Sequence, residues 1–151
     1  MFRLFVYGTL QPGEVSYHLC SKNLIEPPLP TIARGTLYAL PLGYPAMAPG
    51  KGLVRGYTLT FENPAVLDIL DRYERLAPVE LEHYAPGQSL ELSQYRRQEI
   101  AVTLRGGGEP IQVWAYTMTT EQVKRLGGIE LKDGQWTRRK QLAAFSESQH
   151  H

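Results

Sequence analysis

Phe2-Arg3-Leu4-Phe5-Val6-Tyr7-Gly8-Thr9-Leu10 is the stretch that the rest of the chain is expected to pack around. Its aromatic and β-branched residues favour a strand that runs into Gly8. Glycine adopts backbone angles that other residues avoid, so we expect a sharp bend at Gly8, and Gln11-Pro12-Gly13 then ends the strand. Such a turn points the amides of Gly8, Thr9 and Leu10 into one space, where converging amides bind carboxylates and oxyanions. The alternative is an N-terminal strand followed by an ordinary turn.

The composition of the chain argues against several classes of function. Its 151 residues, 42% of them hydrophobic, suit one domain with a real core, and a formal net charge of +1 favours neither nucleic acid nor a membrane as a partner. We find no long apolar run and no secretory signal, so we expect a cytoplasmic protein. Cys20 is the only cysteine, which excludes an internal disulfide and a multi-cysteine zinc site. It is either a small buried hydrophobe or a nucleophile close to His18.

Hydrophobic patterns predict an α+β domain of short elements. Strands are expected at Thr31–Leu40, Leu53–Phe61, Gln94–Leu104 and Ile111–Tyr116, and helices at Glu14–Lys22, from Asn63 onward and at Glu121–Leu126. Gly35, inside the second strand, indicates a bulge or a close backbone approach. Two turn-rich links are expected, at residues 41–46 and 49–52, and residues 146–151 are expected to form a disordered polar tail.

Glu74 is the candidate catalytic residue. The helix that carries it begins with Asn63 as its N-cap and places Leu67 and Leu70 on one apolar face. Glu74 lies four positions after Leu70 and continues that face, where an acid is costly to bury unless it is paired. Desolvation there raises the pKa of a carboxyl and makes it a better proton acceptor near neutral pH. The alternative is that the helix ends first and Glu74 faces water.

Other candidates lie in loops and at a strand entry. Tyr44, in a proline-flanked loop, either lines a pocket or anchors its own loop. Arg96 and Arg97 either bind a carboxylate or mark a solvated strand end. The long link at residues 76–94 is typical of a lid or a binding loop, and we expect it to control specificity.

Two motifs connect these candidates to a known family. Val6-Tyr7-Gly8-Thr9-Leu10-Gln11-Pro12-Gly13 resembles the opening signature of the gamma-glutamylcyclotransferase-like family, in which a Tyr-Gly-(Ser/Thr)-Leu loop holds the substrate. Leu70-Asp71-Arg72-Tyr73-Glu74 is similar to the family's Leu-Asp-x-x-Glu motif, whose glutamate is the catalytic acid/base. Gly43-Tyr44-Pro45, the Tyr95 strand entry and Gly134-Gln135-Trp136 also match. The chain departs from the pattern at Arg75, where the family often has glycine.

The resemblance implies a small closed mixed β-barrel flanked by short helices, formed by a single domain over residues 1–145. It implies cyclisation of a gamma-glutamyl amide to 5-oxoproline with release of an amine, and no cofactor or metal. Glu74 would be catalytic. The substrate would be bound by Tyr7, Gly8, Thr9, Leu10, Tyr44 and Tyr95. The alternatives are a binding module of the same fold without turnover and a structural protein with a vestigial pocket, and the leaving amine and the oligomeric state stay open.

Overall fold

The chain folds into strands and short helices. The computed structural model describes residues 1–41, 43–66, 68, 70 and 95–148. Its elements are β1 (Phe2–Val6), α1 (His18–Ser21), β2 (Leu29–Ala39), β3 (Pro45–Phe61), β4 (Arg96–Leu104), β5 (Ile111–Thr117), α4 (Thr120–Arg125), β6 (Ile129–Glu130) and α5 (Arg138–Ser148). Residues 65, 66, 68 and 70 are also helical. Asn63 caps them as expected, because its Oδ1 accepts a hydrogen bond of 2.9 Å from the N–H of Ala65.

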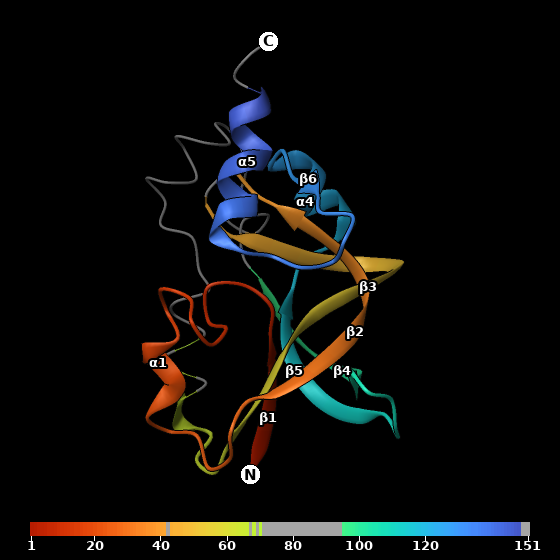
Figure 1. Ribbon diagram of the computed structural model, residues 1–151. Coiled ribbons are helices and arrows are strands. Elements are labelled where there is room, and N and C mark those ends of the chain that lie inside the picture. The colour runs from red at the N-terminus through yellow and green to blue at the C-terminus, as the bar shows by residue number, and fades with distance from the viewer. Residues whose placement is uncertain (42, 67, 69, 71–94, 149–151) are drawn as a thin grey trace.

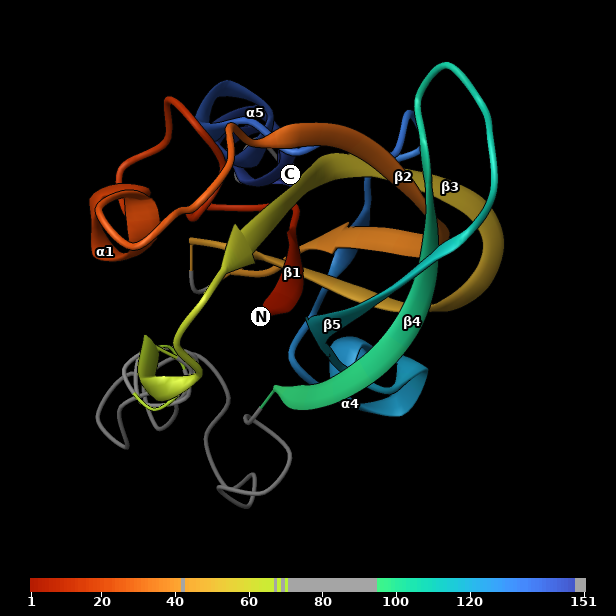
Figure 2. The same cartoon turned by 90° about the horizontal axis from the view of Figure 1, so that it is seen from below.

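Five of the strands close into a barrel. β1 pairs antiparallel with β3 and parallel with β5, while β2 pairs antiparallel with β3 and β4, and β4 with β5, which completes the ring. β6 pairs with the C-terminal end of β2. Figure 1 shows α4 and α5 at the upper end of the barrel, and Figure 2 shows the strands curving around a common interior with α1 and α4 outside it. The prediction of an α+β fold with a closed mixed β-barrel and short helices is confirmed.

Strand β1 is buried on both of its faces, which makes it the centre of the fold. Successive side chains of a strand point to opposite faces. Phe5 packs in one cluster with residues of β2, β3, β4 and β5 inside the barrel. Leu4 and Val6 pack in a second cluster, which also contains Val66 and Leu70 of the following helical segment. The apolar face predicted for that helix is therefore buried at Leu70.

The second predicted turn-rich link, residues 49–52, is wrong: it lies within β3. Thr36 pairs with Ala48 and Arg34 pairs with Leu53, so Gly35 stands opposite four residues of β3. This register shift is the bulge predicted at Gly35. A Cβ atom on Gly50 would lie 1.9 Å from Thr36 Oγ1, so only glycine fits at this crossing. Proline and glycine here bend a continuous strand, as Figure 1 shows, instead of separating two strands.

The C-terminal helix α5 is the main element that sequence patterns did not predict. It continues to Ser148, so it includes the first three residues of the segment assigned to a disordered tail, and residues 149–151 lie outside the described part of the chain. None of the described helices has the length and apolar character needed to span a membrane.

Candidate functional site

In the loop after β1, backbone carbonyl groups accept hydrogen bonds from other residues of the same loop. Gly8 O accepts hydrogen bonds from the backbone N–H of Gln11 at 3.0 Å and from Gln11 Nε2 at 3.1 Å. Thr9 O accepts from the N–H of Ser16 at 2.9 Å. Within the part of the chain that the structure describes, the amides of Gly8 and Leu10 have no backbone acceptor. The two carbonyl groups are thus used within the loop, while these two N–H groups make no backbone hydrogen bond among the described residues.

Gly8 is required for a different reason from the one predicted. Its φ angle is not positive, so the loop needs no conformation reserved for glycine at this position. A Cβ atom would instead lie 2.7 Å from Pro45 Cγ and 2.8 Å from Pro45 Cδ, which is closer than real contacts allow. The absence of a side chain lets Pro45, at the start of β3, pack directly on the loop. Close packing against Pro45, and not a special backbone angle, is therefore the reason that position 8 needs glycine.

Two tyrosine hydroxyl groups hold the start of β3 beside the loop. The Tyr7 hydroxyl donates to Tyr116 O at 2.5 Å and accepts from the N–H of Met47 at 3.1 Å, and Tyr7 is buried. The Tyr95 hydroxyl donates to Pro45 O at 2.6 Å. Both phenols were predicted to bind substrate. In the structure both make hydrogen bonds to the backbone that fix the position of the site.

Tyr7→Phe is expected to destabilise the fold by about 1–3 kcal/mol, because the buried Tyr116 carbonyl and the Met47 N–H each lose a partner. Denaturant unfolding measures the change in the free energy of unfolding. Tyr17→Phe is the matched control, since among the described residues no hydrogen bond of its hydroxyl is seen, and it should stay within about 0.5 kcal/mol. Equal effects of the two variants would show that the Tyr7 hydroxyl does not support the fold.

A buried chain of polar groups joins the first loop to the C-terminal segment. Gln11 Nε2 donates to Trp136 O at 3.2 Å as well as to Gly8 O. Trp136 Nε1 donates to Gln141 Oε1 at 2.8 Å, and Gln141 Nε2 donates to Leu40 O at 2.7 Å. Gln11, Trp136 and Gln141 are all buried, so each bond matters more than it would in water. This chain of hydrogen bonds holds α5 against the loop and against the end of β2.

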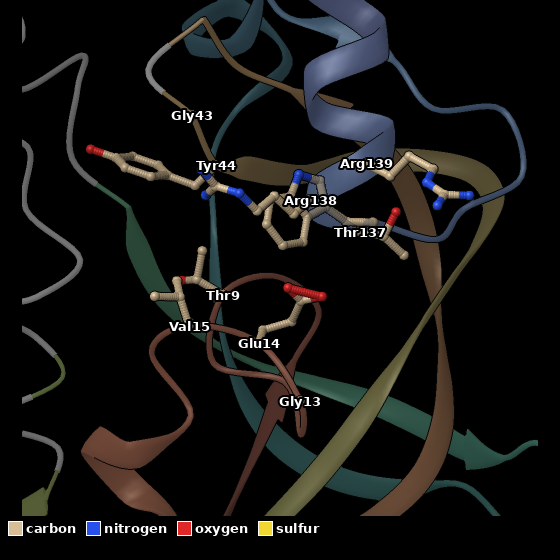
Figure 3. Close-up of a pocket in the computed structure, with 10 residues that line it drawn as sticks. Thr9, Gly13, Glu14, Val15, Gly43, Tyr44, Thr137, Arg138 and Arg139 are labelled. Atoms are coloured by element: carbon tan, nitrogen blue, oxygen red, sulfur yellow. The ribbon is translucent and has the colours of Figure 1, made fainter.

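A cavity of about 820 Å³ opens between these segments. Its described lining comes from the first loop (Thr9, Gly13, Glu14, Val15), the β2–β3 turn (Gly43, Tyr44) and the start of α5 with the residues before it (Trp136, Thr137, Arg138, Arg139). Figure 3 shows the Arg138 side chain reaching across the cavity toward Tyr44, while Arg139 is directed to the opposite side. The Tyr44 phenol points away from Glu14 and Thr137. Thr9 and Tyr44, both predicted site residues, therefore line one cavity.

The other predicted site residues have varied positions. The Leu10 side chain is buried in the cluster of Leu4 and Val6 and is not among the residues that line the cavity. The Arg97 guanidinium lies 5.6 Å from the centre of the Trp114 ring, and neither Arg96 nor Arg97 is among the residues that line the cavity. Glu74 and the link at residues 76–94 lie outside the described residues. The described residues contain no group of three or more His, Cys, Asp or Glu placed to hold a metal ion.

Sequence reasoning missed the arginines of α5. Arg138 and Arg139 follow the Gly-x-Trp motif directly, but two adjacent basic residues are also typical of a solvated helix end. Within the described chain, neither guanidinium is held by a carboxylate, whereas Arg125 pairs with Glu121 and Lys140 pairs with Asp133. The sequence feature that could have indicated these arginines is their position directly after Trp136. Only the folded structure shows that this position faces the first loop.

Cys20 is a buried hydrophobe, as one of the two interpretations predicted. Its side chain is fully buried in the cluster beside β1, and its Sγ–H donates to Tyr17 O at 3.5 Å. Burial raises the pKa of the Cys20 thiol to about 11, so the group stays protonated at neutral pH. His18 is exposed and its Nδ1 contacts Val15 O at 3.0 Å, away from the sulfur. Cys20 is therefore unsuited to act as a nucleophile.

The Cys20 thiol is expected to resist a thiol-specific disulfide reagent at pH 7 in the folded protein and to react fully after unfolding. A rise in pKa of two units lowers the thiolate fraction about 100-fold, and burial slows access further. The double variant Cys20→Ala/Lys22→Cys is the control, because residue 22 is exposed and places one thiol two positions away. Reaction of Cys20 as fast as that of the control would contradict burial of the sulfur.

One family model and several solved structures match most of the chain. A family model described as "Gamma-glutamyl cyclotransferase, AIG2-like" matches residues 4–138. An AIG2-like protein from Mus musculus has 21% identity and a TM-score of 0.64, with 91% of this chain and 88% of that chain covered. The protein PH0828 from Pyrococcus horikoshii has 14% identity, a TM-score of 0.58 and full coverage of both chains.

A third structure is a longer protein. YkqA from Bacillus subtilis has 18% identity and a TM-score of 0.62, and the alignment covers 94% of this chain but 42% of that one. At these identities the structural likeness shows the fold alone. No curated protein matches the chain.

Proposed function

Because the chain belongs to the gamma-glutamyl cyclotransferase, AIG2-like family, we propose that it cyclises a gamma-glutamyl amide to 5-oxoproline and releases an amine. The observation that carries the proposal is the loop after β1. Its amides at Gly8 and Leu10 have no backbone acceptor among the described residues, and Thr9 between them lines the cavity. A substrate carbonyl that accepts from these amides has its developing negative charge stabilised, and the rest of the substrate has room in the cavity.

The proposed reaction is intramolecular. The α-amine of the glutamyl group attacks its own γ-carbonyl carbon, so that a C–N bond forms within a five-membered ring and the bond to the leaving amine breaks. The proton lost by the attacking nitrogen ends on the departing nitrogen. The enzyme must hold the substrate in the attacking conformation, and well-oriented intramolecular reactions gain up to about 7–11 kcal/mol in this way. No protein nucleophile is needed.

Glu74 is proposed to carry the proton between the two nitrogens. A single carboxylate can accept the proton from the α-ammonium group and later donate it to the leaving amine. Support comes from the described helical residues before it in sequence, because Leu70, four positions earlier, packs in the same buried cluster as Leu10. The last described residue before Glu74 in sequence is thus packed with the loop that would hold the carbonyl.

The test is a panel of gamma-glutamyl amides assayed for 5-oxoproline. The panel contains amides of amino acids, of the lysine side chain, of polyamines and of simple amines. Formation of 5-oxoproline with stoichiometric release of amine from at least one amide is expected. Binding of a panel member by calorimetry with no turnover would identify a binding module instead, and neither binding nor turnover would overturn both readings.

A further inference from the structure

We propose that Gln11 is a positioning residue for the cyclisation, because its side chain fixes the peptide unit that joins the two amides of the first loop. This inference rests on the proposed function, in which the N–H groups of Gly8 and Leu10 stabilise the carbonyl oxygen of the substrate. The evidence is the pair of hydrogen bonds that the Gln11 side chain makes, the burial of that side chain and the place of Gly8 O between the two amides.

The peptide unit formed by the carbonyl of Gly8 and the N–H of Thr9 lies between the two proposed donors along the backbone. Peptide units are planar and, in the described chain, trans, so the direction of Gly8 O determines how this whole unit is turned. The directions of the Gly8 and Leu10 N–H groups relative to one another depend on that turn. Glycine restricts rotation about its own backbone bonds only weakly, so Gly8 does not hold the unit in place by itself.

Gln11 holds this peptide unit through two hydrogen bonds to one oxygen. Gly8 O accepts from the Gln11 backbone N–H at 3.0 Å and from Gln11 Nε2 at 3.1 Å. The backbone bond is that of a tight turn, which any residue with an N–H group can make. The side-chain bond needs the amide group, because Nε2 also donates to Trp136 O at 3.2 Å. Both partners are carbonyl oxygens, which accept and do not donate, so the nitrogen and not the oxygen of this side chain must face them.

The second partner of Gln11 is itself fixed. Trp136 Nε1 donates to Gln141 Oε1 at 2.8 Å, and Gln141 Nε2 donates to Leu40 O at 2.7 Å. Gln11 is 6% exposed, so water has little access to replace a lost side-chain hydrogen bond. The Gln11 side chain therefore ties Gly8 O to the C-terminal segment, and the direction of the peptide unit depends on this tie.

Gln11 acts on the reaction through the loop and not by touching the substrate. It is absent from the described lining of the cavity, whereas Thr9 is part of that lining. Negative charge on the substrate carbonyl oxygen grows on the way to the transition state, so well-placed amides stabilise the transition state more than the bound substrate. Misplaced amides should therefore lower kcat with little change in KM.

Gln11→Leu removes the side-chain donor and keeps a side chain of similar size. With the amide that the panel identifies as the best substrate, we expect kcat to fall about 10- to 100-fold and KM to change less than about threefold, a part of the cost of deleting one such donor. Thr31→Val is the matched control for loss of stability, because it removes a buried hydrogen bond of 2.8 Å between the Thr31 and Thr58 hydroxyl groups, outside the cavity lining. It should leave kcat within about twofold, since the two sites are independent. Melting curves set an assay temperature at which every variant is folded.

Gln11→Glu gives a second readout that a loss of stability would not produce, and it keeps the test decisive if Gln11→Leu does not fold. A carboxylate has no proton to donate to the two carbonyl oxygens, whereas the protonated acid donates one hydrogen bond. Burial beside these oxygens raises the pKa of the introduced carboxyl. Relative to the wild-type protein at the same pH, kcat of Gln11→Glu should rise at least about fivefold from about pH 8 to about pH 5.5, while relative kcat of Gln11→Leu stays constant. The ionisable groups of the described cavity lining are present in all three proteins, so a change in their charge is common to the three; they are Glu14, Tyr44, Arg138 and Arg139.

Each result decides between named alternatives. If folded Gln11→Leu keeps kcat within about twofold of that of Thr31→Val, Gln11 is not a positioning residue and the proposed function stands. A higher KM with normal kcat would also overturn the inference, because Gln11 would then act in substrate binding. So would a relative kcat of Gln11→Glu that does not change with pH, because the hydrogen bond would then not be the cause. If the wild-type protein forms no 5-oxoproline from any amide of the panel, the proposed function fails and this inference fails with it.

Discussion

Glu74→Gln is expected to lower kcat for cyclisation by about 10²- to 10⁴-fold, the usual contribution of a positioned general acid/base. The substitution keeps the shape of the side chain and removes its capacity to accept a proton. The attacking α-amine is protonated at neutral pH, so the reaction cannot begin until a base removes that proton. Substrate should still bind, because the loop amides and the cavity are unchanged. Steady-state assays of 5-oxoproline formation give kcat, and calorimetry with an unreacted gamma-glutamyl amide gives the affinity.

The matched control for this variant is Asp68→Asn. Asp68 is exposed on the helical segment that comes before Glu74 in the sequence, and it is changed from acid to amide in the same way. It should retain turnover within about twofold, since surface substitutions away from special features are nearly neutral. Near-normal kcat in Glu74→Gln would remove Glu74 from the mechanism. Loss of binding together with kcat would instead mean that Glu74 holds the substrate.

Local patterns predicted the part of the fold that local chemistry determines. The first strand was predicted from its aromatic and β-branched residues, and the structure forms it as β1 over Phe2–Val6. Asn63 caps its helical segment as predicted, through a side-chain hydrogen bond between near neighbours in sequence. Trp136 was expected to pack and is 3% exposed.

What the patterns missed depends on segments far apart in the chain. Position 8 needs glycine because Pro45, 37 positions later, packs against it. This contact joins residues too far apart in sequence for a local pattern to indicate it. Position 50 likewise needs glycine because Thr36 packs against it. The prediction of a link at Pro49–Gly52 was wrong because proline and glycine also occur where a strand is bulged. α5 is anchored by Gln141, a polar residue whose side chain donates to Leu40 O, 101 positions earlier in the chain. The position of Arg138 beside the first loop depends on that anchoring and could not be predicted without it.

The site is thus built on contacts between the first loop, the β2–β3 turn and the C-terminal segment. Pro45 packs on Gly8, the Tyr95 hydroxyl holds Pro45 O, and Gln11 bonds both Gly8 O and Trp136 O. A rigid loop is what electrostatic stabilisation requires, because donors fixed before the reaction need no reorganisation during it. Substitutions of the residues that make these contacts should therefore reduce turnover even where the residues touch no substrate.

Trp136→Ala is expected to be the most destabilising of the substitutions considered, at about 3–5 kcal/mol, the usual cost of removing a buried aromatic side chain. Trp136 lies in the barrel cluster with Phe5, Tyr7 and Val54, and its Nε1 donates to Gln141. Truncation leaves a cavity inside the barrel and an unpaired Gln141 Oε1. For a chain of 151 residues the melting temperature should fall by about 6–20 °C, at roughly 2–4 °C for each kcal/mol.

Two further variants separate the packing of Trp136 from its hydrogen bond. Trp136→Phe keeps most of the ring and removes the N–H, so it should cost about 1–3 kcal/mol from the unpaired Gln141 oxygen. In the double variant Trp136→Phe/Gln141→Leu that oxygen is gone. The loss of stability in the double variant should therefore be smaller than the sum of the losses in the two single variants. Leu142→Ala, on the exposed side of α5, is the control and should stay within about 0.5 kcal/mol.

If Trp136→Ala has the same melting temperature as the control, α5 does not brace the first loop. Turnover measured below the melting transition should then be normal as well. The expected result is the opposite: a folded Trp136→Ala protein at low temperature with reduced kcat, because Gln11 has lost the anchored carbonyl that helps it hold Gly8.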